Sequence, residues 1–170
     1  MLTKTEAECW LPRAGLERDK NGDLGYRNGS NLRVIVPLPD KPYRLPYLAN
    51  LVLTAYMKPF VESLVWFTGW GAGGEVSNPV GFTIVQSLRG DSRPLIEAPA
   101  HLCQTTQQVE AQSLLVVAML MGWDAYFIPA SQRYFVFNSN DEFIDVVSND
   151  AKTHERFLTV LAADWNGREG

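Results

Sequence analysis

The chain has little cysteine, no long apolar run and no excess of positive charge, and each shortage excludes a class of protein. Only two of its 170 residues are cysteines. Because no apolar leader opens the sequence, Cys9 and Cys103 are expected to be free thiols in a reducing cytoplasm. The longest apolar run, 114–121, is far shorter than the roughly 20 residues that span a bilayer. The formal net charge of −4 argues against binding nucleic acid through bulk charge. We therefore expect a cytoplasmic protein with no membrane span and no direct contact with nucleic acid.

Two segments resemble ligand-binding loops but lack essential residues. A calcium loop that started at Asp19 would have Leu24 where glycine is needed and Ser30 where a bidentate glutamate is needed. The glycine-rich run 70–74 follows a predicted strand, but Val76 replaces the third glycine of a dinucleotide-binding loop. The chain has only two histidines and two cysteines, so it has few of the side chains that usually coordinate a metal such as zinc. The sequence therefore predicts no cofactor and no metal site.

Negative charge is concentrated near the C-terminus. Residues 138–170 contain seven Asp/Glu and three Lys/Arg, so they account for the whole net charge of −4. Such asymmetry is explained either by a solvated surface that keeps the protein soluble or by a surface that binds a basic partner.

Apolar periodicity and turn residues predict a mixed fold. Helices are expected at 46–58, 105–121 and 150–165, and extended segments at 31–36, 61–70, 80–88, 94–102, 123–128, 134–137 and 142–147. Because the strands come in runs, antiparallel pairing is favoured. We expect an α+β fold, with a mainly antiparallel sheet of five to seven strands and about three helices packed on one face. Residues 1–30 are interpreted as an irregular arm that can contain a hairpin, and 31–170 as a single domain.

Capping signals support two of these helices. Thr105 and Gln108 have the spacing of a capping box, and Asp150 is expected to be the N-cap of the last helix. The run 114–121 is apolar on all sides, which predicts a helix buried behind the sheet.

Two pairs of residues would suit a small enzyme. His101 and Cys103 lie two residues apart on an extended segment, so their side chains share a face, and imidazole beside thiolate is the chemistry of a cysteine nucleophile. Asp124 and Asp141 form a carboxylate pair that could perform acid–base catalysis. The alternatives are a buried structural cysteine and a hydrated polar turn around Asp141.

The same acidic region supplies candidates for a protein-binding surface. Carboxylates attract a basic partner, and an aromatic side chain next to a glycine-rich loop is a suitable interface anchor. The candidate partner-binding residues are Asp141, Glu142, Asp145, Asp150 and Trp70.

Three segments carry a resemblance to a protein family. Residues 97–102 (EAPAHL), 122–126 (GWDAY) and 138–143 (NSNDEF) are similar to elements of small bacterial proteins that resemble immunity proteins encoded beside toxins. The chain departs from that pattern at Ala100, where glycine is expected, and at Asn140, where histidine is expected. The second departure weakens the case for a catalytic role.

These observations lead to three hypotheses. The preferred one is a cytoplasmic, non-enzymatic, immunity-type protein that neutralises a cognate toxin, for instance a toxin domain with a basic cleft, by direct binding through an acidic surface. The second is a small hydrolase or cysteine-dependent enzyme that uses His101 and Cys103, or Asp124 and Asp141. The third is a structural or regulatory subunit that forms homo-oligomers through an exposed sheet edge.

Overall fold

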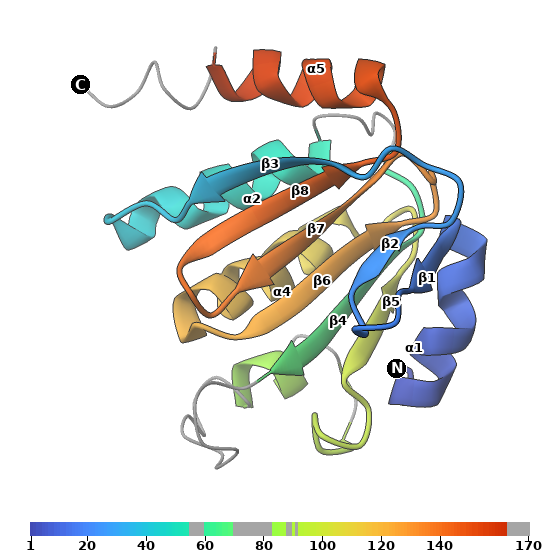
Figure 1. Cartoon of the computed structure of the whole chain (residues 1–170). Helices are drawn as coiled ribbons and strands as arrows, with labels where there is room; N and C mark the ends of the chain where they lie inside the picture. Colours follow the sequence, from blue (N-terminus) through green and yellow to red (C-terminus); the bar gives the residue numbers. More distant parts are fainter. Residues whose placement is uncertain (55–59, 70–82, 88–89, 91, 163–170) are drawn as a thin grey trace.

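Six antiparallel strands form the central sheet (Figure 1). The computed structural model describes residues 1–54, 60–69, 83–87, 90 and 92–162. The strand order is β3-β8-β7-β6-β4-β5, and neighbouring strands are antiparallel throughout. The strands are β3 (Leu32–Pro37), β4 (Ser63–Gly69), β5 (Ala100–Cys103), β6 (Asp124–Pro129), β7 (Tyr134–Ser139) and β8 (Phe143–Ser148). The predicted α+β fold on a mainly antiparallel sheet is confirmed.

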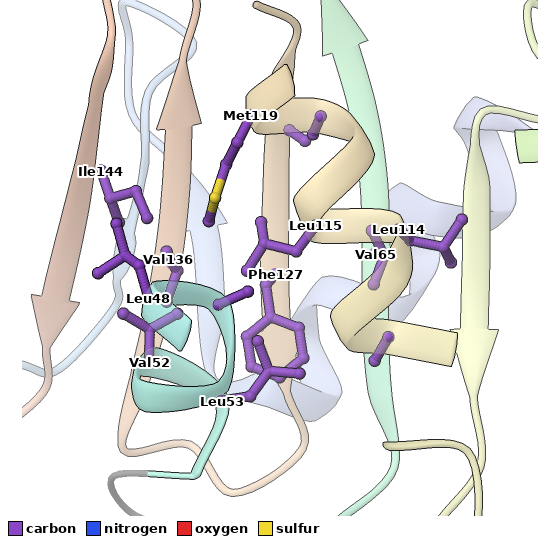
Figure 2. Close-up of a cluster of buried hydrophobic side chains, with 14 of the residues drawn as sticks. Leu48, Val52, Leu53, Val65, Leu114, Leu115, Met119, Phe127, Val136 and Ile144 are labelled. Carbon is purple, nitrogen blue, oxygen red and sulfur yellow. The ribbon is translucent and has the colours of Figure 1, made fainter. Parts of the chain in front are cut away.

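Three helices cover one face of the sheet, called the helix face below. They are α2 (Leu45–Thr54), α4 (Gln108–Met121) and α5 (Ala151–Val160). Fully buried side chains fill the space between helices and strands, among them Leu115, Phe127 and Val136 (Figure 2). The Tyr134 hydroxyl lies 2.9 Å from the carbonyl oxygen of Val52 near the end of α2, so this buried phenol is hydrogen bonded. The expected group of about three helices on one face is confirmed.

The N-terminal residues cover part of the opposite face, called the arm face below. Their elements are α1 (Lys4–Trp10), a 3-10 helix η1 (Leu11–Ala14), and a hairpin of β1 (Leu16–Arg18) and β2 (Leu24–Tyr26). A second apolar core forms beneath them, in which Leu64, Trp66, Phe135 and Val147 of the main sheet are buried. We call these N-terminal elements the arm.

The hairpin within the arm agrees with the sequence prediction, whereas helix α1 was not predicted. Its start is fixed by a capping box, in which Thr3 Oγ1 accepts a hydrogen bond from the Glu6 backbone N–H at 3.3 Å. The Glu6 carboxylate accepts in return from the Thr3 backbone N–H at 2.7 Å. This capping box satisfies two free backbone N–H groups at the start of a short helix. Its Thr-x-x-Glu spacing can be recognised in the sequence.

The prediction of a strand over 80–88 is wrong. Residues 83–87 are helical, and 80–82 and 88 lie outside the described residues. Val85 is fully buried in the core of the helix face, while Ile84 is 39% exposed. A short apolar run does not distinguish a strand from a buried helical turn.

The extended segment predicted for 94–102 is much shorter than expected. The carbonyl oxygen of Pro94 accepts hydrogen bonds from the backbone N–H groups of Glu97 (3.0 Å) and Ala98 (3.2 Å). The chain therefore turns here, and strand β5 begins only at Ala100.

Helix α4 begins at Gln108, three residues later than predicted, and the Thr105–Gln108 capping box does not form. Instead, the backbone N–H of Gln104 donates to Gln107 Oε1 at 2.9 Å. The apolar run of α4 is not buried on all sides as predicted, because Leu120 is 49% exposed. One stripe of the helix faces solvent and the rest faces the sheet.

Helices α2 and α5 begin close to the predicted residues, at Leu45 and Ala151. Asp150 is the N-cap of α5 as predicted, and its carboxylate accepts from the Thr153 backbone N–H at 2.9 Å. The predicted ends of both helices, at 58 and 165, lie outside the described residues. No helix in the described part of the chain combines the length and apolar character needed to cross a membrane.

Candidate functional site

The arm covers only one end of the arm face. Helix α1 and the β1–β2 hairpin lie over the end at which β7 begins and β8 ends (Figure 1). At the other end, which we call the open end, Phe137 of β7 and Phe143 of β8 are half-buried. Tyr126 of β6 is also half-buried and lies at the boundary, where it packs against the core beneath the arm. The rings of Tyr126 and Phe137, which are cross-strand neighbours, lie 4.8 Å apart. Pairs at this separation attract each other beyond simple burial.

The turn between β7 and β8 contains carboxylates directly before Phe143. Asp141 and Glu142 lie in this turn and are exposed. Asp124, at the start of β6, approaches the same turn, because its Oδ1 accepts from the Asn140 backbone N–H at 2.9 Å. Gly69 makes room for Asp124, since a Cβ there would lie 2.5 Å from Asp124 Oδ2. Of the two carboxylates considered for catalysis, Asp124 thus bonds the residue that precedes Asp141, and one of its oxygens is engaged in holding the turn.

Glu142 has an unusual backbone conformation for its residue type. Its φ is +64°, in the left-handed region where glycine and asparagine are favoured. Gln132, in the turn at the covered end of β7, has a similar φ of +56°. The Gln132 side chain donates to the carbonyl oxygen of Arg13 in the arm at 2.9 Å. The carboxylate of Glu142 has no hydrogen bond or ion pair with any described residue. The Glu142 backbone carbonyl accepts a hydrogen bond from the Leu38 N–H at 2.8 Å, so the backbone of this residue is held within the fold while its side chain is not.

Asp145 lies on the same face but contributes little free negative charge. It is 3% exposed and pairs with Arg33 at 2.8 Å, while the other carboxylate oxygen, Oδ1, has no hydrogen-bond partner. Its cross-strand neighbours are Ile35 and Phe137. Burial raises the pKa of Asp145, and the Arg33 guanidinium opposes this shift. Among the sequence candidates, Asp145 is therefore a charge buried beneath the surface of the open end.

Asp150 lies far from the open end, beyond the last residue of β8. Hydrogen bonds from the backbone and hydroxyl of Thr153 lower the pKa of its carboxyl. Its contacts explain it as a helix cap. Of the four candidate carboxylates, only Asp141 and Glu142 are both exposed and adjacent.

His101 and Cys103 share one face of β5, as the spacing predicts. They are cross-strand partners of Val65 and Ser63 on β4. Cys103 is completely buried, and burial raises the pKa of its thiol to about 12. His101 is 8% exposed, and its Nδ1 lies 3.0 Å from the sulfur of Met1. A reactive cysteine needs an accessible thiolate, which Cys103 does not supply.

Two further sequence candidates are not placed. Trp70 and the glycine-rich run 70–74 lie outside the described residues. Within the described ranges, no group of three or more His, Cys, Asp or Glu side chains is arranged to hold a metal ion.

Sequence reasoning missed Phe137 and Phe143 of the open end and Tyr126 at its boundary. Tyr126 belongs to an alternating strand, where one face is expected to be buried. How much of that face is buried depends on how far the arm extends over it. The arm reaches the sheet through contacts between residues far apart in the sequence, which local patterns do not reveal. The signal available in the sequence was the aromatic side chains of Phe137 and Phe143 on either side of an acidic turn.

Comparison with known proteins adds no assignment. No family model matches the chain, and no curated protein or solved structure matches it.

Proposed function

We propose that the chain is a non-enzymatic, immunity-type protein that binds a cognate toxin through the open end of the arm face. One observation carries the proposal: the exposed turn residues Asp141 and Glu142 directly precede the half-buried Phe143, on the sheet face that also presents the half-buried rings of Phe137 and Tyr126. Protein interfaces combine an aromatic centre with a polar, solvent-accessible rim. The open end has this composition.

The carboxylates define the charge of the partner. Attraction between opposite charges accelerates encounter and selects a basic surface. A toxin that acts on nucleic acid has a basic cleft because it must hold phosphates. Asp141 and Glu142 would lie where those phosphates bind and would block the cleft. The resemblance of residues 138–143 to immunity-type proteins supports the same class, and such a protein acts in the cytoplasm beside its toxin.

The backbone of Glu142 supports an intermolecular role for its carboxylate. A residue in a sparsely populated conformation persists when something compensates for it. For Gln132 the compensation is its hydrogen bond to the arm. The backbone of Glu142 is held by the Leu38 N–H, but its carboxylate has no partner among the described residues, and we propose that basic side chains of the toxin pair with it.

A charge-reversal experiment tests this proposal. The Asp141→Lys/Glu142→Lys protein is compared with the wild type and with Glu97→Lys/Glu155→Lys, which reverses two exposed carboxylates outside the β7–β8 turn. Each protein is immobilised and incubated at low salt with a lysate of the native organism. We expect the wild type and the control variant to retain the same basic protein, which the Asp141/Glu142 variant loses. Equal retention by all three would refute the acidic binding surface.

A further inference from the structure

A groove of about 460 Å³ lies where the arm meets β4 and the turn before β5. Its floor includes the buried residues Trp66 and Pro99, and the rest of its lining is Lys4, Glu8, Arg18, Gly22, Phe67, Thr68 and Ile96. Pockets that hold small organic molecules have volumes of roughly 300–1,000 Å³. Neither Asp141 nor Glu142 lines this groove, so it is separate from the acidic turn of the open end.

Arg18 is fixed at one side of the groove. Its guanidinium lies over the Trp66 ring, 5.1 Å from the ring centre, which is a cation–π contact. Its Nη1 donates to the carbonyl oxygen of Gly22, and its Nε lies 3.6 Å from Glu8 Oε1. The other terminal nitrogen, Nη2, has no acceptor among the described residues. A guanidinium held in this way offers a donor to a ligand at a reduced entropic cost.

Lys4 and Thr68 are two more groove residues with unused donors. Both are exposed, and neither side chain has a hydrogen bond or an ion pair with any described residue. The pairing of β4 with β6 changes register around Thr68, and bulges of this kind are frequent beside binding sites. Among the groove residues, the cations Lys4 and Arg18 face a single carboxylate, that of Glu8. The lining therefore has an excess of one positive charge.

These donors and one apolar side chain define the chemistry of a ligand. Donors without acceptors favour an anion, and Ile96, which is 71% exposed, offers an apolar contact in the same groove. A phosphate dianion fits poorly, because phosphates are held by several arginines or by backbone N–H groups. The Glu8 carboxylate also repels two negative charges more strongly than one. A singly charged carboxylate with an apolar body fits the lining better.

We propose that this groove binds a small organic carboxylate, with the carboxylate facing Lys4 and Arg18 and the apolar body against Ile96. This goes beyond the proposed function and does not depend on it. Because Lys4 and Arg18 are exposed, the attraction is screened by salt. Binding should therefore weaken as the ionic strength rises.

Two probes that differ in charge test the ligand class. The wild type is titrated with phenylacetate and with phenylacetamide, which carry the same ring, and binding is followed by the NMR shifts of backbone amides. We expect phenylacetate to bind with a Kd of about 1 mM, to shift residues that line the groove most, and to bind at least about five-fold more tightly than the amide. Equal affinities for the two probes, or no groove shifts with phenylacetate at about 10 mM, would overturn the proposal.

A pair of lysine variants tests the charge contact. Lys4→Gln is compared with Lys41→Gln, which removes the same charge from an exposed residue outside the groove. Lys4 is the first residue of α1, where a cation is unfavourable, so its removal does not weaken the helix. We expect Lys4→Gln to bind phenylacetate about three-fold more weakly than Lys41→Gln. Equal affinities would contradict the proposal.

A pair of apolar variants tests the contact with the body of the ligand. Ile96→Ala is compared with Val109→Ala, because each side chain is 71% exposed and only Ile96 lines the groove. Truncating an exposed side chain disturbs the fold little. We expect Ile96→Ala to bind phenylacetate about three-fold more weakly than Val109→Ala. Equal affinities of these two variants would likewise overturn the assigned binding mode.

Discussion

The two ends of the arm face are built from the same strands but are completed differently. At the covered end, Phe135 lies beneath the arm and is 2% exposed. At the open end, Phe137 lies two residues further along the same strand and is half-buried. The turns at the two ends share one backbone feature, because each contains a non-glycine residue with positive φ, Gln132 at the covered end and Glu142 at the open end.

The difference between these ends shows what each is suited to do. At the covered end, the unusual backbone of Gln132 is explained by a hydrogen bond to the arm. At the open end, Glu142 precedes the half-buried Phe143 and has an exposed carboxylate with no described intramolecular partner. We infer that the covered end stabilises the fold and that the open end binds a partner.

The largest expected difference between the two ends is in stability. Phe135→Ala should lower the free energy of unfolding by about 3–5 kcal/mol, because it leaves a cavity beneath the arm. Phe137→Ala should lower it by roughly 1 kcal/mol, because part of its ring is already hydrated. Urea unfolding of both variants measures the difference. Equal losses would show that the open end is as much a part of the core as the covered end.

The two turns offer a smaller and more specific comparison. Glu142→Gly should raise the free energy of unfolding by about 0.5–1 kcal/mol, because glycine adopts positive φ without strain. Gln132→Gly should bring no net gain, because the same relief is offset by loss of the hydrogen bond to Arg13. Thermal and urea unfolding measure both. A destabilised Glu142→Gly protein would reveal an intramolecular role for this carboxylate.

The smallest expected effect is on the pH dependence of the free energy of unfolding. Replacing Asp145 and replacing Asp150 should change this pH dependence in opposite directions. Burial raises the pKa of Asp145 in the folded state, so its contribution to stability falls as pH rises from about 4 through the raised pKa. Asp145→Asn should remove that fall and make the variant relatively more stable at pH 7 than at pH 4, by less than about 1 kcal/mol.

Asp150→Asn is the matched comparison. Hydrogen bonds lower the pKa of Asp150, so its contribution is present above the unfolded pKa of about 4 and is lost as pH falls through the lowered value. Asparagine keeps the cap but not the charge, so this variant should lose stability at pH 7 relative to low pH. Urea unfolding across this pH range measures both variants. If both substitutions changed the pH dependence of stability in the same direction, the buried environment assigned to Asp145 or the helix-cap environment assigned to Asp150 would be wrong.

Much of the fold is determined by local patterns and could be predicted. The strands from 123 to 148 alternate regularly between polar turns, and Asp150 marks the start of α5 as a side-chain cap should. The helical residues 83–87 could not be predicted, because a short apolar run is ambiguous between helix and strand. The position of the arm is fixed by contacts with strands more than 100 residues away, such as Phe135 and Val147.

Only the part of the candidate site that depends on local sequence could be predicted, because the rest depends on contacts between distant residues. Asp141 and Glu142 were identified because exposed carboxylates follow from a polar turn. The burial of Asp145 could not be read from the sequence, since it depends on Arg33 from an edge strand. The aromatic centre could not be read either, because alternation does not say which half of a sheet face the arm covers.

The measurement that tests the central claim most directly is the affinity of the captured partner for two variants with the same change in charge. We predict that, at low salt, Asp141→Lys/Glu142→Lys binds the partner at least about ten-fold more weakly than Glu97→Lys/Glu155→Lys, and that added salt narrows the gap. Equal affinities for the two variants would show that the open end of the arm face is not the binding surface.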